Sequence, residues 1–361
     1  MLTLEYCRRR QKRLLAWMEQ ERLAEVVLAN PKTIYYFTGA LVDPMLPQLW
    51  TMNDSGRSLL ITNQQPGETA AGQVQLYTGY TIERPFNRTT MVQEMAALLP
   101  SLRGAVGLEA DFVPCALGQA GGADITPALD EMRRIKDPDE LDSIRDTVRL
   151  VETGYQAIKG RLEPGLTECQ VYTLFYQALV EHAGTSVDLR GDFACGTRAI
   201  RGGGPPTSRR LANGDLYILD IFPLYRGYHC DLTRTFSLGF PTELQLEAWE
   251  TVREAHRLAE RLIRPGLAAR DFYHQIRAHL ETFQPARGSF WHHLGHGFGM
   301  NGWEFPWLTP GSPHLLQEGE VLAVEPAVYG ECLQGGIRLE RDYLVGAEGV
   351  TPLDSFPLEL R

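Results

Sequence analysis

The sequence has no apolar stretch of about 20 residues and no apolar segment of the signal-peptide type near its N-terminus. Its six cysteines are scattered along the chain, and no Cys-x-x-Cys pair occurs. Scattered cysteines without a secretory signal are typical of a reducing compartment and argue against a disulfide framework. We therefore expect a cytoplasmic protein with no membrane partner.

The sequence also lacks long runs of one charge. Its 361 residues include 35 basic and 45 acidic side chains, and this net charge of −10 argues against nucleic acid as a main partner. The glycine-rich segment at residues 201–206 is not followed by Gly-Lys-Ser/Thr, so it does not predict a phosphate-binding loop. The acidic surplus suggests that some acids are grouped for a reason other than solubility.

A chain of this length is expected to form two domains. In residues 1–130, apolar runs typical of strands alternate with helical patterns, which predicts a small α/β domain with a largely parallel sheet. The expected strands are at 25–29, 58–62, 73–77 and 105–109, and the expected helices are at about 4–22 and 90–102. A charged segment at 131–140 then opens a second domain, residues 131–361.

The second domain contains Pro-Gly-Leu twice, at residues 164–166 and 265–267, each time after a long amphipathic helix. If these segments repeat each other, the domain is built of two similar α+β halves, and a site at their junction draws ligands from both. The alternative is that Pro-Gly is only a common helix stop. The sequence leaves both interpretations open.

A predicted β-hairpin in this domain carries two aspartates eleven residues apart. The apolar run 216–219 leads to Asp220, the chain turns at residues 225–227, and the returning strand starts at Asp231. A carboxylate at the end of a buried strand, answered by a second one, is costly unless a positive charge lies between them. The hairpin therefore predicts a cation site.

Three further residues are candidate ligands: His296, Glu325 and Glu340. Taken alone, each has an ordinary explanation as a loop or salt-bridged residue. Together, the four carboxylates and the imidazole favour a metal site over these separate explanations. Two carboxylates about 4 Å apart repel by roughly 4 kcal/mol at an effective dielectric constant near 20, so a cluster of them needs a cation. Two divalent cations would cancel four negative charges. Oxygen ligands with one imidazole favour manganese, cobalt, iron or zinc, and two such ions could hold a bridging hydroxide that attacks a carbonyl.

The order of these motifs resembles the pita-bread metallopeptidases, which include methionine aminopeptidase, prolidase and aminopeptidase P, with creatinase as a metal-free relative. After the two aspartates come Gly-His-Gly at 295–297, Val-Glu-Pro at 324–326 and Gly-Ile-Arg-Leu-Glu at 336–340. Residues 31–39 and 132–140 are similar to the N-terminal signature and the domain boundary of the creatinase, prolidase and aminopeptidase P branch. The resemblance implies an α+β fold: a pita-bread domain of two similar α+β halves around an antiparallel sheet, preceded by a smaller α/β creatinase-type domain.

The resemblance also implies which residues hold metal. Asp220 and Asp231 would hold one divalent ion, and Asp231 with His296, Glu325 and Glu340 would complete the second site and the bridge. Manganese is the first choice, with cobalt, zinc or iron as alternatives. A homodimer is implied by the family alone.

Other residues would serve the reaction. Glu325 would be the proton shuttle and His292 a second catalytic residue. Thr233 would hold Asp231 in place from behind. Arg338 would orient a glutamate or bind the carboxyl end of the substrate.

The sequence departs from the family at two positions. Family peptidases carry one histidine seventeen residues before the first aspartate ligand, where this chain has Gly203, and another seven residues after the ligand histidine, where it has Trp303. In the family both imidazoles contact the substrate amide and the tetrahedral intermediate, and losing such a donor costs about 2.7–4 kcal/mol of transition-state stabilisation. We expect His292 to take over part of this role, with His293 and His229 as weaker candidates, and Trp303 to form an apolar wall of the substrate site.

Three functions are compatible with these features. The first is a di-metal exopeptidase for dipeptides, or for peptides with proline after the first residue, and the complete ligand set favours it. The second uses the same metal site on another small molecule, by C–N hydrolysis or by C–S or C–O elimination, and the two missing histidines motivate it. The third is a binding protein that has lost catalysis, although decay usually removes ligands as well. We expect the first.

Overall fold

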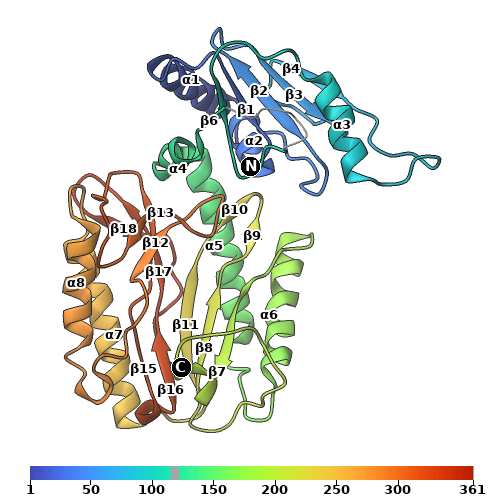
Figure 1. Ribbon diagram of the computed structural model, residues 1–361. Coiled ribbons are helices and arrows are strands. Elements are labelled where there is room, and N and C mark those ends of the chain that lie inside the picture. The colour runs from blue at the N-terminus through green and yellow to red at the C-terminus, as the bar shows by residue number, and fades with distance from the viewer. Residues whose placement is uncertain (115–121, 361) are drawn as a thin grey trace. The chain divides into compact units, whose positions relative to one another are not determined.

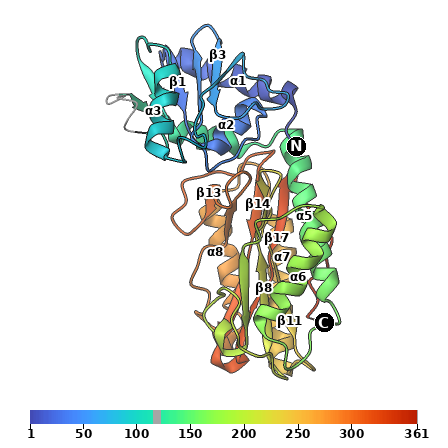
Figure 2. The ribbon, with the colours of Figure 1, turned by 90° about the vertical axis from the view of Figure 1, so that its right-hand side faces the viewer.

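The computed structural model describes residues 1–114 and 122–360, which form two compact units, Met1–Met132 and Arg133–Arg361, seen from two sides in Figures 1 and 2. Every helix in this part of the chain is too short or too polar to cross a membrane. Among the described residues, no disulfide involves the cysteines Cys7, Cys169, Cys195, Cys230 and Cys332. Cys115 lies outside the described residues.

The N-terminal unit is the smaller of the two. Its elements are α1 (Leu4–Gln20), β1 (Glu25–Leu28), α2 (Pro31–Thr38), β2 (Leu49–Asn53), β3 (Ser58–Thr62), β4 (Gln73–Leu76), α3 (Arg88–Leu98), β5 (Val106–Leu108) and β6 (Ala123–Asp124), and α4 (Thr126–Arg134) leads into the second unit.

Local signals in the sequence set the first two helices. The Thr3 hydroxyl caps α1 by accepting from the Tyr6 N–H, and Asn30 caps α2, whose first residue is Pro31. Gly39 ends α2 with a left-handed backbone (φ 70°), which a glycine adopts without strain. These caps account for the starts of both helices and for the end of α2. The helix α1 was expected at about 4–22, whereas α2 was not among the expected helices.

The sheet of the N-terminal unit has the order β4-β3-β2-β1-β5-β6. The pairs β1/β5, β3/β4 and β5/β6 are parallel, whereas β2 runs antiparallel to both β1 and β3. The expectation of a largely parallel sheet is therefore only partly right. It misses β2, whose apolar run is hidden between the turn residues Pro44, Pro47 and Gly56.

The second unit holds the remaining elements. They are α5 (Pro138–Ile158), α6 (Glu168–Ala183), β7 (Gly191–Cys195), β8 (Leu216–Ile221), β9 (Leu224–Tyr225), β10 (Tyr228–His229), β11 (Leu232–Ser237), α7 (Glu243–Leu262), α8 (Ala269–Leu280), β12 (Gly295–Gly297), β13 (Glu304–Leu308), β14 (Val321–Val324), β15 (Ala327–Gly330), β16 (Gly335–Arg338), β17 (Arg341–Val345) and β18 (Val350–Pro352). Figure 1 shows α5 and α6 on one side of the strands, next to β7, and α7 and α8 on the other.

The two halves of this unit repeat the same local hydrogen bonds. After α5, the Gly165 N–H donates to the Leu211 carbonyl at 2.8 Å, and after α7, the Gly266 N–H donates to the Leu316 carbonyl at 2.8 Å. Each leucine N–H donates back to the carbonyl of the residue after the glycine. Both glycines have positive φ, 99° and 87°. Pro-Gly-Leu is thus more than a helix stop, and the prediction of two similar α+β halves is confirmed.

The predicted hairpin is formed by β8 and β11, which pair antiparallel with Thr233 opposite Asp220. Asp231 comes just before β11, so it is not the direct partner of Asp220. The other neighbour of β8 is β7, on which Asp192 lies opposite Asp220. The turn at residues 226–227 has positive φ at both positions, as in the type I′ turns that close two-residue hairpins.

Strands of the second half reach this hairpin through backbone and side-chain hydrogen bonds. The Glu340 N–H donates to the Thr233 carbonyl at 3.0 Å, and the Arg338 N–H donates to Thr235 Oγ1 at 3.1 Å. The hairpin belongs to a sheet of order β11-β8-β7, and the second half forms a sheet of order β13-β12-β14-β17-β18. Every strand pair that the structure describes in these sheets is antiparallel.

Candidate metal centre

All five predicted ligands lie in the second unit and come from different elements. Asp220 is on β8, Asp231 directly precedes β11, His296 is in the middle of β12, Glu325 follows β14, and Glu340 joins β16 to β17. All five side chains are buried. Because buried carboxylates are costly without compensating charge, their contacts decide whether a cation fits.

Three of the five form a compact group. Ligand atoms of Asp231, His296 and Glu340 lie within 4.8 Å of one another. His296 Nδ1 is 2.9 Å from the Gly297 carbonyl oxygen, which can only accept, so Nδ1 carries the proton. His296 Nε2 then turns a lone pair toward Asp231 Oδ2, 3.6 Å away. Two facing lone pairs in a buried site are the arrangement of two ligands of one cation.

The electrostatics of this group fit a divalent metal. Burial lowers the pKa of His296 to about 4, so the imidazole is neutral at neutral pH. Burial, followed by the charge of Glu340, raises the pKa of Asp231 well above its ordinary value, and burial and Asp220 do the same for the pKa of Glu340. Within the described part of the chain, Asp231 Oδ1 has no hydrogen-bond partner. A cation bound by these oxygens and one imidazole would offset the repulsion.

Thr233 orients Glu340 rather than Asp231. Its Oγ1 donates to Glu340 Oε2 at 2.7 Å. The expected contact with Asp231 is therefore wrong. Asp231 is held instead by its own backbone N–H, which donates to Oδ2 of the buried Asp342 at 3.1 Å.

Asp220 stands apart from the compact group because an arginine engages it. Arg338 Nη2 donates to Asp220 Oδ2 at 2.5 Å and to Asp192 Oδ2 at 3.0 Å. Burial raises the pKa of Asp220 to about 6, although the charge of Arg338 opposes the shift. Asp220 Oδ1 is buried and has no hydrogen-bond partner among the described residues. One oxygen of Asp220 thus remains available as a ligand.

Glu325 forms a second group with two histidines. His293 Nδ1 lies 2.8 Å from Glu325 Oε1, and His292 Nδ1 lies 3.7 Å from Glu325 Oε2. Burial alone would raise the pKa of Glu325, but the contact with His293 and the charge of Arg338 outweigh it and lower the pKa to about 2. Glu325 is therefore ionised at neutral pH. His293, the weaker candidate from sequence, makes the closer contact.

Tyr329 links the histidine group to the arginine. Its hydroxyl lies 2.9 Å from His292 Nε2 and 3.4 Å from Arg338 Nη1. His292 Nδ1 is 2.7 Å from the His293 carbonyl oxygen, so Nδ1 carries the proton and Nε2 accepts from Tyr329. Burial lowers the pKa of His292, which favours this neutral form. Sequence reasoning missed Tyr329, because a tyrosine in an apolar strand is usually a core residue.

The two positions that depart from the family have distinct surroundings. A Cβ added at Gly203 would lie 1.8 Å from Asp192 Oδ2, so no side chain fits there while Asp192 keeps its position. Sequence reasoning missed Asp192, and only its pairing opposite Asp220 would have revealed it. Trp303 is 66% exposed, and its ring lies edge-on to His296 with centroids 6.4 Å apart.

A further acidic group lies at the start of α5. Ligand atoms of Asp137, Asp139 and Glu140 are close together. The Asp137 N–H donates to Glu140 Oε2 at 2.9 Å as half of a capping box, and carboxylates in the first turn favourably oppose the helix dipole. A helix cap explains this group without a metal.

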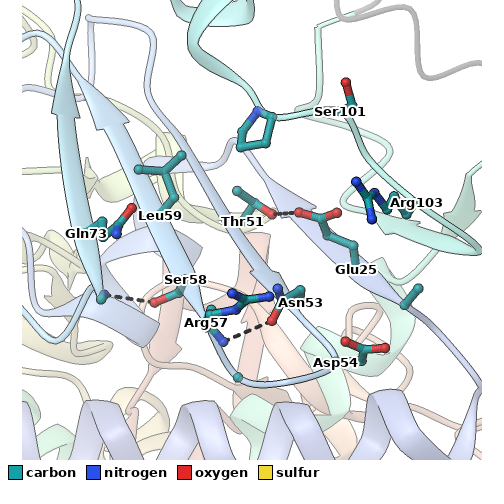
Figure 3. Close-up of a pocket in the computed structure, with 14 residues that line it drawn as sticks. Glu25, Thr51, Asn53, Asp54, Arg57, Ser58, Leu59, Gln73, Ser101 and Arg103 are labelled. Carbon is teal, nitrogen blue, oxygen red and sulfur yellow. Dashed lines mark hydrogen bonds between the residues drawn. The ribbon is translucent and has the colours of Figure 1, made fainter.

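The N-terminal unit has a pocket of about 860 Å³ at one end of β1 to β4, shown in Figure 3. Part of its polar lining is hydrogen-bonded within itself: Thr51 Oγ1 donates to Glu25 Oε1 at 2.6 Å, and the Arg57 N–H donates to Asn53 Oδ1 at 3.0 Å. None of its lining residues is a histidine, a cysteine or a predicted ligand. The candidate metal centre therefore lies in the second unit.

Comparisons with known proteins agree with this geometry. The profile of metallopeptidase family M24 matches residues 142–347, and that of the creatinase/prolidase N-terminal domain matches residues 10–135. An uncharacterized peptidase of Staphylococcus aureus is 26% identical over 347 residues, which cover 91% of this chain and 94% of that protein.

Two solved structures share the fold of the whole chain. The prolidase from Pyrococcus horikoshii has a TM-score of 0.84 at 22% identity and covers 98% of this chain and 100% of its own. The Xaa-Pro dipeptidase from Bacillus anthracis has a TM-score of 0.83 at 23% identity, with 98% and 99% covered. The predicted α+β fold, a pita-bread domain after a smaller creatinase-type domain, is confirmed.

Proposed function

Because the chain belongs to metallopeptidase family M24, we propose that it is a metal-dependent exopeptidase that cleaves dipeptides, or peptides with proline after the first residue. The observation that carries this proposal is the buried group of Asp231, His296 and Glu340, whose lone pairs and charges call for a cation. The similar prolidase and Xaa-Pro dipeptidase support the choice of substrate. We assign catalysis to residues 131–361 and an accessory role to residues 1–130.

We propose two divalent ions, with manganese as the first choice and cobalt, zinc or iron as alternatives. Asp231, His296, Glu325 and Glu340 would hold one ion, and Asp220 would share the other with Asp231. When bound, such ions polarise a peptide carbonyl and lower the pKa of water, so that a nucleophile is available at neutral pH.

Glu325 is the proposed proton shuttle. It is ionised at neutral pH, and His293 Nδ1 lies 2.8 Å from its Oε1. We assign Oε2 to accept a proton from the attacking water and to pass it to the departing amine, a role that the bound ions would assist by lowering the pKa of that water. His292 lies 3.7 Å from the same oxygen and keeps its own orientation through Tyr329.

Arg338 is assigned to orient Asp220 rather than to bind the substrate. Its guanidinium is buried and donates to Asp220, to Asp192 and to the Tyr329 hydroxyl. These contacts leave it little freedom to reach the carboxyl end of a peptide. Trp303, which is exposed next to His296, is the better candidate for a wall of the substrate site.

A second candidate function keeps the metal centre and changes the substrate. The Asp192 carboxylate fills the space that a side chain at position 203 would occupy. A carboxylate cannot donate a hydrogen bond to a substrate amide as an imidazole can. This difference favours a non-peptide small molecule as the alternative, cleaved at a C–N bond or by C–S or C–O elimination.

Metal analysis combined with a dipeptide panel separates the candidates. About two equivalents of metal with faster hydrolysis of X-Pro than of X-Ala dipeptides is the result we expect. Stoichiometric metal without any peptide hydrolysis would favour the second candidate. The absence of both metal and hydrolysis would leave only a binding protein. Light scattering tests the homodimer that we also propose.

A further inference from the structure

Asp192 adds a carboxylate at the edge of the proposed active site. Its Oδ2 accepts from Arg338 Nη2, the same nitrogen that donates to Asp220, so one guanidinium balances two carboxylates. The Asp192 side chain is 28% exposed, compared with 7% for Arg338 and 12% for Asp220. Asp192 is therefore the member of this group that a solute can reach.

A glycine loop lies against Asp192 and carries an exposed indole on its neighbouring residue. The absent side chain at Gly203 makes room for the Asp192 carboxylate. A Cβ at Gly202, whose φ is 115°, would lie 3.5 Å from Trp291 Cζ2, so the indole packs on the same loop. Trp291 is 65% exposed and directly precedes His292 of the Glu325 group. The Asp192 carboxylate and the Trp291 indole thus lie against two consecutive residues of one glycine loop.

A carboxylate beside an exposed indole favours a positively charged group. The carboxylate can accept a charge-assisted hydrogen bond from an ammonium or guanidinium, and the indole attracts the same cation through its π face. A substrate carboxylate at this place would be repelled, and an apolar group would leave the Asp192 carboxylate without a new partner.

We propose that Asp192 and Trp291 form a subsite that binds a protonated amino or guanidino group of the substrate. The inference rests on the proposed peptidase function and narrows its substrates to those with a positive charge near the scissile amide. Such a charge can come from a basic side chain or from the terminal α-amino group, and the test distinguishes these two sources.

The test compares kcat/KM of the full-length chain with Mn²⁺ for three amides. Lys-Pro carries both positive charges, norleucyl-proline keeps only the α-amino group, and hexanoyl-proline has neither. If the side chain is the source, the wild type prefers Lys-Pro to norleucyl-proline by about tenfold, and Asp192→Asn removes the preference. If the terminal α-amino group is the source, the wild type prefers norleucyl-proline to hexanoyl-proline by about tenfold, and Asp192→Asn removes this preference. Trp291→Leu should reduce the affected ratio by about threefold.

Ratios of kcat/KM do not depend on how much of a variant folds, so they report recognition alone. Asp188→Asn is the matched control, because its carboxylate is 50% exposed and paired with Arg190. It should leave both ratios at the wild-type values. If Asp192→Asn also leaves both ratios unchanged, the subsite is refuted.

Failure of the peptidase proposal has a different signature. If the wild type hydrolyses none of the three amides, that proposal falls, and the same compounds are titrated into wild type and Asp192→Asn by calorimetry. Tighter binding of the charged compounds that Asp192→Asn abolishes would support the subsite. Equal affinities in both proteins would overturn it.

Discussion

At the scale of single residues, the Thr233 hydroxyl orients a proposed metal ligand, Glu340, and is not itself a proposed ligand. Because Thr233 fixes Glu340 Oε2, we expect Thr233→Val to weaken metal binding about 10–100-fold while the fold is kept. Calorimetric titration of the metal-free protein with Mn²⁺ measures this change.

Thr235→Val is the matched control for this prediction. Thr235 is equally buried on the same strand, but its hydroxyl donates to the Arg338 carbonyl at 2.8 Å instead of to a carboxylate. It should lose comparable stability and retain most of the metal affinity. Equal affinities of Thr233→Val and the wild type would contradict the assigned role of Thr233.

The sequence indicates the ligands more readily than their partners. Asp231, His296 and Glu340 can be found from motifs, because the residue types that hold metals recur at characteristic spacings. The contact of Asp192 with Arg338 depends on which strands lie side by side, and that pairing comes from the tertiary fold. The same reason explains why the partner of Thr233 was predicted wrongly.

At the scale of elements, the equivalent turns at Gly165 and Gly266 predict that alanine substitution lowers the free energy of unfolding equally in the two halves. Both glycines have strongly positive φ, a backbone that strains any residue with a Cβ. We expect Gly165→Ala and Gly266→Ala each to lower the free energy of unfolding by about 1–2 kcal/mol. Urea denaturation followed by circular dichroism measures the loss.

Gly311→Ala is the control for both glycine variants. A Cβ at Gly311 meets no heavy atom within 4 Å, and its φ lies outside the strained positive range. It should change the stability little. A large loss in one half with none in the other would speak against equivalent turns.

Elements with strong local signals could be predicted, and those without them could not. The hairpin strands β8 and β11 follow from apolar runs, and the start of α5 follows from the capping residues Asp137 and Glu140. β2 was missed because its neighbours are turn residues. The register that sets Thr233 opposite Asp220 was also missed, because the extra pair β9/β10 lies between the two strands.

At the scale of the whole molecule, a buried histidine predicts acid sensitivity. His256 Nε2 lies 2.9 Å from the Leu339 carbonyl oxygen, and burial lowers the pKa of His256 to about 3. In the unfolded chain the His256 imidazole takes up a proton near pH 6.5. Between about pH 6.5 and 3, this residue is therefore protonated more fully in the unfolded state than in the folded state. This contribution to stability is complete above pH 6.5 and falls by up to about 1.4 kcal/mol per pH unit as the solution is acidified.

Substitution of His256 by a residue that does not titrate should flatten this dependence. We expect the urea midpoint of His256→Gln to fall less, or to rise more, than that of the wild type when the pH is lowered from 7 to 5. The exposed His274, changed to Gln, should leave the dependence unaltered. An identical pH dependence in His256→Gln and the wild type would show that His256 does not cause it.

Metal uptake by the wild type and by Asp231→Ala tests the proposed metal centre most directly. Because neighbouring carboxylates repel Asp231, its removal should not unfold the metal-free protein. Asp142→Ala, at a 77% exposed carboxylate of α5, is the control. We expect about two equivalents of Mn²⁺ in the wild type and in Asp142→Ala, and none in Asp231→Ala. Stoichiometric metal retained by Asp231→Ala, or no uptake by the wild type, would contradict the centre.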